Sequence, residues 1–192
     1  MCGIAGYFNP DQNYAENPKQ NFHTLSRMIN TMNHRGPDTY GHTIINSCCL
    51  AHTRLSIIDL ENGRQPMSYT KDGNTYYIVY NGEIYNYKEV KKTLLRKNYT
   101  FETNSDTEVI IAAFCHYGPG FVKELNGIFA IAIYDSMRNT LYLYRDRFGV
   151  KPLYYTKTGD TLVFASRIDT LFEYPRVRPC IDMNSFNEIF SL

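Results

Sequence analysis

The feature that most constrains the fold of this chain is a near-continuous apolar run, IFAIAIYD, at residues 128–135. A short apolar run rich in β-branched and aromatic residues predicts a buried strand. Residues 140–145 (TLYLYR) follow across a polar turn and predict a second strand that pairs with the first. The sequence therefore predicts a buried antiparallel hairpin in this part of the chain.

The remaining segments alternate between strand and helix patterns. Further strands are predicted at residues 3–9, 41–60, 75–81, 152–156 and 161–165. Helices are predicted over about 20–33, 86–97 and 105–117, with a short one after Ser166 and another from Asp182. The expected helix N-caps are Asn86, Ser105, Ser166 and Asp182. Strand runs mixed with paired helices are typical of the α+β class with layered sheets.

Composition excludes several classes of function. The chain has 192 residues and a net charge of +1, so neither a nucleic-acid footprint nor an acidic tail is indicated. No apolar window is long enough to span a membrane, and no signal-peptide pattern is present. The five cysteines show no CxxC spacing, which favours reduced thiols over disulfides or a zinc site. These observations predict a cytoplasmic protein without a metal site.

Cys2 follows the start methionine directly and runs into the small-apolar strand pattern GIAGYFN. If Met1 is removed, this residue carries both a thiol and a free α-amine. Reference pKa values are about 7.7–8.0 for such an amine and about 8.5 for a thiol, so the pair can act as general base and nucleophile. Taken alone, however, a buried cysteine in a terminal strand is the simpler interpretation. The nucleophile hypothesis requires partners elsewhere in the chain.

Residues 81–83 offer candidate oxyanion donors. The Asn81 side-chain amide and the Gly82 backbone N–H could converge on one oxygen, as acyl-transfer chemistry requires. Asn-Gly is also a strong signal for a tight turn, and on this interpretation the strand 75–81 ends there. Glu83 is either a surface residue or a ligand contact.

Two charged residues could recognise an amino acid. Arg54 lies among apolar residues, where it suits a bidentate grip on a carboxylate or an internal ion pair with Asp38 or Asp59. Asp106 opens a predicted helix, where the helix dipole favours a carboxylate, but it could equally bind an ammonium group. The charged loops 35–38 and 145–149 are interpreted as mainly structural, the second as a candidate contact surface for another domain.

The motifs taken together resemble a known family. They are, in order, MCGIAG at the start, HRGPD at 34–38, RLSI at 54–57, QPM at 65–67, NGEIYN at 81–86, SDTE at 105–108, LNGIFA at 125–130 and RDRFGVKPLYY at 145–155. This ordered set resembles the N-terminal glutaminase domain of glutamine-dependent asparagine synthetases, a class II glutamine amidotransferase. The likeness covers the whole of residues 1–192, which we interpret as one amidotransferase domain.

The resemblance implies a fold and a set of roles. The fold is an α+β four-layer αββα sandwich of two antiparallel sheets, as in N-terminal-nucleophile (Ntn) hydrolases. The implied catalytic residues are Cys2 as nucleophile, with Asn81 and Gly82 as the oxyanion hole. The implied substrate contacts are Arg54 to the carboxylate of L-glutamine, Asp106 with Glu83 to its ammonium group, and the backbone around Leu55, Ile57 and Ile58.

The same resemblance implies partners. The expected reaction is hydrolysis of L-glutamine to glutamate and ammonia, with no cofactor in this domain. The ammonia would pass to a synthetase domain, in cis or in trans, that uses ATP and magnesium to make asparagine and is absent from this sequence. Two alternatives stay open: another ammonia acceptor, or a non-catalytic module that senses glutamine or binds a partner. The oligomeric state, a homodimer included, also stays open. One departure is Arg167, where family members commonly carry Glu, and it bears on the contact surface or local capping.

Overall fold

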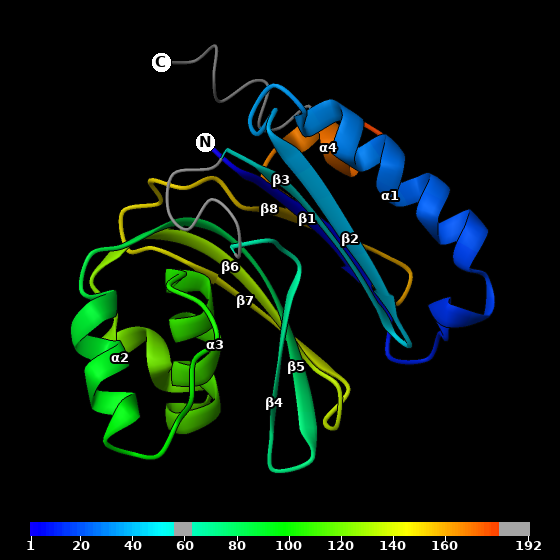
Figure 1. Cartoon of the computed structure of the whole chain (residues 1–192). Coiled ribbons are helices and arrows are strands. Elements are labelled where there is room, and N and C mark those ends of the chain that lie inside the picture. The colour runs from blue at the N-terminus through cyan, green and yellow to red at the C-terminus, as the bar shows by residue number, and fades with distance from the viewer. Residues whose placement is uncertain (56–62, 181–192) are drawn as a thin grey trace.

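The computed structural model describes residues 1–55 and 63–180. Two antiparallel sheets face each other, and helices cover both outer faces (Figure 1). The predicted four-layer αββα architecture is confirmed. In the described part of the chain no helix is long and apolar enough to cross a bilayer, and no three His, Cys, Asp or Glu side chains are grouped to hold a metal ion.

The first sheet, sheet A, has the strand order β2-β3-β1-β9-β8 among the described residues. Its strands are β1 (Gly3–Phe8), β2 (Thr39–Ile45), β3 (Cys48–Arg54), β8 (Tyr154–Thr158) and β9 (Thr161–Ala165). The helices associated with it are α1 (Pro18–Met32), α4 (Ile168–Leu171) and the 3-10 helix η1 (Tyr14–Glu16). The first residues of the chain thus form the central strand of a sheet, which holds them in place.

The second sheet, sheet B, has the order β4-β5-β6-β7. Its strands are β4 (Met67–Lys71), β5 (Asn74–Ile84), β6 (Gly127–Asp135) and β7 (Thr140–Arg145). The helices beside it are α2 (Tyr87–Leu95), α3 (Asp106–Tyr117) and the 3-10 helix η2 (Gly118–Glu124). The predicted hairpin of 128–135 with 140–145 is therefore confirmed as β6 and β7.

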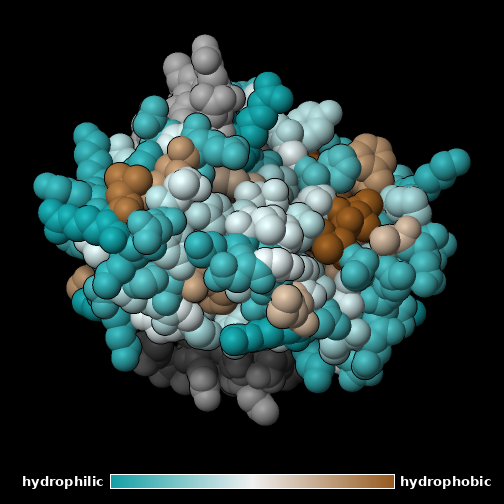
Figure 2. All heavy atoms as spheres, turned by 60° about the horizontal axis from the view of Figure 1, so that its bottom comes forward, coloured by the Kyte–Doolittle hydropathy of each residue, from teal (hydrophilic) through white to brown (hydrophobic). Residues whose placement is uncertain are grey.

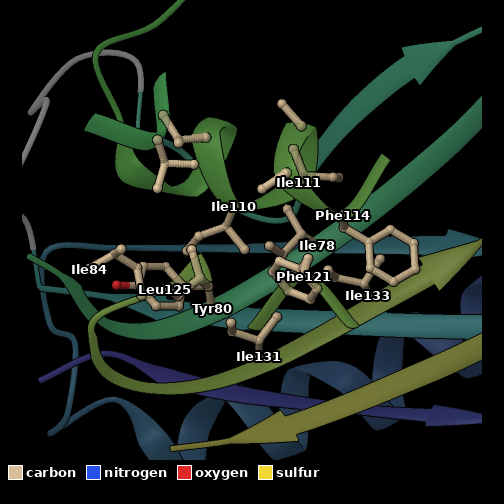
Figure 3. Packing of buried hydrophobic residues seen from close by; sticks show 14 of the residues in the cluster. Ile78, Tyr80, Ile84, Ile110, Ile111, Phe114, Phe121, Leu125, Ile131 and Ile133 are labelled. Atoms are coloured by element: carbon tan, nitrogen blue, oxygen red, sulfur yellow. The ribbon is translucent and has the colours of Figure 1, made fainter. Parts of the chain in front are cut away.

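Three apolar clusters hold the four layers together. One lies between sheet B and its helices, where Ile110 and Phe114 of α3 pack against strand residues such as Ile78 (Figure 3). A second lies between sheet A and α1, and a third fills the space between the sheets around Ile4 and Phe164. The outer surface in Figure 2 is mostly hydrophilic, with small separate apolar patches. Strand side chains alternate between faces, so neighbouring residues of β5 enter different clusters: Ile78 packs against the helices and Val79 lies between the sheets.

The predicted turn at Asn81-Gly82 is wrong, because β5 continues through it to Ile84. Asn81 pairs with Ala130 and Gly82 with Phe129 in the β5–β6 ladder. A Cβ at position 82 would lie 2.2 Å from the carbonyl oxygen of Ile128, so the glycine permits close approach of the two strands. Strand pairing has overridden the local turn propensity of Asn-Gly.

Other boundaries also differ from the sequence prediction. The segment 41–60 contains two strands, β2 and β3, joined by a turn at residues 46–47, and its last residues lie outside the described part of the chain. Strand β4 was not predicted. The helix expected from Asp182 also lies outside the described residues.

The predicted helix caps have mixed outcomes. Ser105 is confirmed as the N-cap of α3, since its hydroxyl accepts the N–H of Thr107 at 3.2 Å. Asn86 occupies the cap position of α2, but its side chain makes no capping bond and contacts the loop before β6 instead. Ser166 does not cap α4, because the N-cap is Arg167 and the Ser166 hydroxyl accepts the N–H of Ile4 at 3.0 Å. Both side chains are used to join distant segments, which a local pattern cannot reveal.

Candidate active site

A cavity lies where β1 begins, where β3 and β5 end, and where α3 starts. It is lined by Met1, Cys2, Arg54, Leu55, Gly63, Gln65, Tyr80, Asn81, Gly82, Glu83, Ser105, Asp106, Thr107 and Lys151. Seven of the nine predicted site residues are in this set: Cys2, Arg54, Leu55, Asn81, Gly82, Glu83 and Asp106. The other two, Ile57 and Ile58, lie outside the described residues. Segments far apart in sequence are thus brought to one place by strand pairing within each sheet and by the packing of the two sheets against each other.

The Cys2 side chain lies against the end of β3. Its Sγ is 3.4 Å from the backbone nitrogen of Leu55, which donates to it, and 3.6 Å from the Leu55 carbonyl oxygen. The carbonyl of Cys2 itself accepts a hydrogen bond from Arg35 Nε at 3.0 Å. The residue is therefore fixed at its thiol and at its backbone, while Met1 before it is 57% exposed.

Strand alternation places the predicted groups on facing surfaces of the two sheets. Cys2 precedes Ile4 by two residues, and Arg54 follows Leu50 by four, so both share the faces of sheet A that point to the inter-sheet core. Asn81 follows Val79 by two residues on β5 and faces the same core from sheet B. The nucleophile candidate and the amide candidate therefore approach the cavity from opposite sheets.

Asn81 carries an unusual donor. Its side chain is 2% exposed, yet its Nδ2 has no hydrogen-bond partner among the described residues. A buried donor left unpaired costs about 1–3 kcal/mol. Such a group in a native fold calls for an explanation, and here the residue lines the cavity beside Cys2.

The edge of β5 supplies further donors past the first residue of β4. That residue pairs with Ile78, and no other described strand pairs with the later residues of β5 on that side. The N–H of Tyr80 donates to Gln65 Oε1 at 2.6 Å, and the N–H of Ile84 donates to Asp106 Oδ2 at 3.4 Å. Alternation along the strand places the N–H of Gly82, midway between them, on the same open edge.

Asp106 is a buried carboxylate that faces the cavity from the first turn of α3. It accepts a hydrogen bond from the Tyr80 hydroxyl at 2.9 Å as well as the longer one from Ile84. Burial raises the pKa of the Asp106 carboxyl, and these hydrogen bonds oppose that rise only in part. Burial and the neighbouring Asp106 carboxylate raise the pKa of Tyr80, so the phenol is a donor to Asp106. Figure 3 shows Tyr80 and Ile84 together at one end of the sheet B cluster.

Sequence reasoning gave no site role to several residues that line or support the cavity, among them Arg35, Gln65, Tyr80 and Thr107. Gln65 stood in the QPM motif without a role, and Arg35 was assigned to a structural loop although it binds the carbonyl of Cys2. The sequence held only a weak signal for these roles, because each of the four residues has a hydrogen-bond partner at least 15 residues away along the chain.

The departure at Arg167 has a local structural account. Its guanidinium pairs with Asp169 at 2.5 Å and lies 2.7 Å from His34 Nε2. Burial and the nearby charge of Arg167 lower the pKa of Arg35. The charge reversal therefore acts next to the residue that holds Cys2, while the cavity lining itself does not include Arg167.

Two facing antiparallel sheets between helical layers, with a cysteine entering the central strand at a cavity, define the Ntn-hydrolase class of fold. The fold is similar to that of glutamine phosphoribosylpyrophosphate amidotransferase from B. subtilis, with a TM-score of 0.68 and 20% identity over 88% of this chain and 42% of that one. A family model described as "Glutamine amidotransferase domain" matches residues 1–192. The chain belongs to this family and is a glutamine amidotransferase domain.

Similar curated proteins are larger than this chain. It is 40% identical to asparagine synthetase [glutamine-hydrolyzing] 3 of Bacillus subtilis (strain 168), over 100% of this chain and 31% of that protein. It is also 40% identical to asparagine synthetase B [glutamine-hydrolyzing] of Escherichia coli (strain K12), over 85% of this chain and 28% of that protein. Amidase chyE of Penicillium rubens is 36% identical over 91% of this chain and 26% of that protein. The chain thus spans about a third or less of the length of these relatives.

Proposed function

We propose that this chain hydrolyses L-glutamine to glutamate and ammonia through a γ-glutamyl thioester on Cys2. The observation that carries the proposal is the cavity itself, in which Cys2, Arg54, Asn81, Gly82 and Asp106 meet. These residues supply a nucleophile, a carboxylate grip, two oxyanion donors and an ammonium partner. The decayed site of a non-catalytic module would have lost at least one of them.

Substrate recognition uses the two charged ends of glutamine. Arg54 binds the α-carboxylate with its planar guanidinium, a geometry suited to bidentate pairing. Asp106 receives the α-ammonium group, with Glu83 at the exposed end of the site. An incoming cation favours the ionised form of a carboxyl whose pKa is raised by burial, so binding offsets the cost of burying Asp106.

The chemical steps follow from the amine and the thiol of one residue. The free α-amine of Cys2 takes the thiol proton, and Sγ attacks the γ-amide carbon. The resulting oxyanion receives hydrogen bonds from Asn81 Nδ2 and the Gly82 N–H. The protonated amine then delivers the proton to the leaving nitrogen, which departs as ammonia, and a thioester forms. Water attacks the thioester, releasing glutamate and restoring the thiol.

This mechanism requires cleavage of the bond between Met1 and Cys2, because an amide nitrogen is not a base. The exposed position of Met1 leaves it open to an aminopeptidase. Arg35 would hold the Cys2 carbonyl after cleavage as it does before, which keeps the new terminus in place.

The ammonia acceptor is proposed from the relatives. Several are named glutamine-hydrolysing asparagine synthetases, so we propose that the ammonia amidates aspartate in a synthetase region, in cis or in trans, with ATP and magnesium. A second candidate keeps the glutaminase and changes the acceptor. It is favoured by the amidases among the relatives, chyE and chry2, each 36% identical to this chain.

The test combines intact mass with a glutamate-release assay on purified protein. We expect the active protein to lack Met1 and Cys2→Ala to abolish glutamate release. A version whose N-terminal extension cannot be removed should be equally inactive, although it folds. Full activity in that extended version would refute the free-amine mechanism, and full activity of Cys2→Ala would refute the nucleophile.

A further inference from the structure

We propose that Gln65 is a positioning residue that joins the oxyanion side of the site to the ammonium side. Its Oε1 accepts the backbone N–H of Tyr80 at 2.6 Å, and its Nε2 donates to the Thr107 hydroxyl at 3.2 Å. We call this pair of hydrogen bonds the Gln65 bridge. The inference rests on the proposed glutaminase function and adds a residue to it.

The first half of the bridge completes a sheet that β4 leaves unfinished. Strand β4 begins at Met67, opposite Ile78, so no backbone acceptor in β4 lies opposite Tyr80. A buried backbone N–H without an acceptor is costly. The Gln65 side chain takes the place of the missing strand and satisfies Tyr80, the residue directly before Asn81. The position of Asn81 and Gly82 at the edge of the cavity thus depends on this bond.

The second half reaches α3. Thr107 is the neighbour of Asp106 in the first turn of the helix, and the hydroxyl of Tyr80 reaches back to Asp106 at 2.9 Å. Gln65 and Tyr80 therefore make two separate links between the β5 edge and the start of α3. Together they fix the distance between the oxyanion donors and the ammonium site.

This arrangement has a consequence for the reaction. Glutamine spans the site from its α-ammonium group to its γ-amide, so both ends must be held at a set separation for attack by Cys2. A misplacement of about 1 Å can lower a rate about 10²-fold. Because both polar ends of the Gln65 amide are engaged with the protein, we assign Gln65 to geometry and not to direct substrate contact.

The experiment uses substitutions of each partner and their combination. Gln65→Leu removes both bonds at similar volume, and we expect kcat to fall about 10–100-fold. Thr107→Val removes only the second bond and should lower kcat about 2–10-fold, whereas Thr107→Ser restores the hydroxyl and most of the activity. The double variant should be no slower than Gln65→Leu alone. Thr31→Val removes a comparable hydroxyl contact, 2.7 Å from Thr170 in the α1 layer, and should leave kcat unchanged.

Amide hydrogen exchange at Tyr80 provides a readout that does not need activity. We expect the Tyr80 N–H to exchange at least tenfold faster in Gln65→Leu than in the wild type. Unchanged exchange would show that the bond from Tyr80 to Gln65 does not protect this N–H, and would overturn the bridge. An increase in KM alone, with kcat intact, would overturn the positioning role and make Gln65 a substrate contact. A lowered Tm with kcat retained would make it merely structural. If the wild type releases no glutamate, the proposed function fails, and the exchange result still decides whether the bridge exists.

Discussion

Two asparagines on β5 allow function and stability to be separated. Asn81 and Asn74 are both buried, at 2% and 7% exposure. Asn81 Nδ2 has no partner in the described chain, whereas Asn74 Nδ2 donates to Asp135 at 2.8 Å and Asn74 Oδ1 accepts from Ser136 and the N–H of Met137. One side chain is therefore available to a substrate, and the other is committed to the fold.

The same substitution should act oppositely at the two sites. Removing one oxyanion donor costs about 10²–10³ in kcat, so we expect that loss in Asn81→Ala with KM little changed. Its Tm should not fall, because Nδ2 makes no bond to lose and a buried unpaired donor is itself costly. Asn74→Ala strips partners from the buried Asp135 and should cost about 1–3 kcal/mol, or about 2–12 °C in Tm, with kcat intact.

Steady-state glutamate release and thermal unfolding, measured on the same preparations, check this pair. An Asn81→Ala variant that keeps its kcat, or loses activity only through a higher KM, would refute the oxyanion role. A large drop in Tm for Asn81→Ala would also contradict the reasoning, since it would show that Nδ2 is satisfied in the fold.

Three further predictions concern charged groups. Burial raises the pKa of Asp106 above its unfolded value, so the fold loses stability as the pH rises and this carboxyl ionises. Asp106→Asn should therefore raise Tm at about pH 8 more than at about pH 4. Equal Tm changes at both pH values would contradict this. The same substitution should abolish tight glutamine binding. Arg54→Lys should raise KM for glutamine at least about tenfold, with a smaller effect on kcat, because Lys lacks the bidentate fork. Burial disfavours the charge of Asp146, yet its carboxylate accepts hydrogen bonds from four backbone N–H groups, which lower its pKa. At a pH above the pKa that Asp146 has in the unfolded chain, Asp146→Ala should destabilise the fold by roughly 1.5–3 kcal/mol. This loss should disappear in acid, as the pH falls through the folded-state pKa.

The sequence predicted the layered fold, because strand and helix patterns are local, and it predicted half of the residues that line the cavity. The apolar run at 128–135 identifies β6, and the Ser105 cap identifies the start of α3. The ordered motifs then identify residues that meet only after folding. Their meeting in one cavity is a property of the structure, while the role of each in catalysis stays a proposal.

The failures come from interactions between distant segments. The Asn81-Gly82 pair has strong turn propensity, but pairing with β6 extends the strand through it. Ser166 is a good cap by composition, but its hydroxyl is used by the N–H of Ile4, 162 residues away. Gln65 gave no local signal, because its side chain takes the place of a strand that begins only two residues later, at Met67.

Whether Cys2 attacks glutamine can be tested by trapping the covalent intermediate. The protein is mixed with L-glutamine, quenched in acid during turnover, and analysed by intact mass and peptide mapping. We expect one γ-glutamyl group on the N-terminal peptide that begins with Cys2, lost again at neutral pH and absent from Cys2→Ala. A γ-glutamyl group on another cysteine, or turnover by protein that still carries Met1, would contradict it.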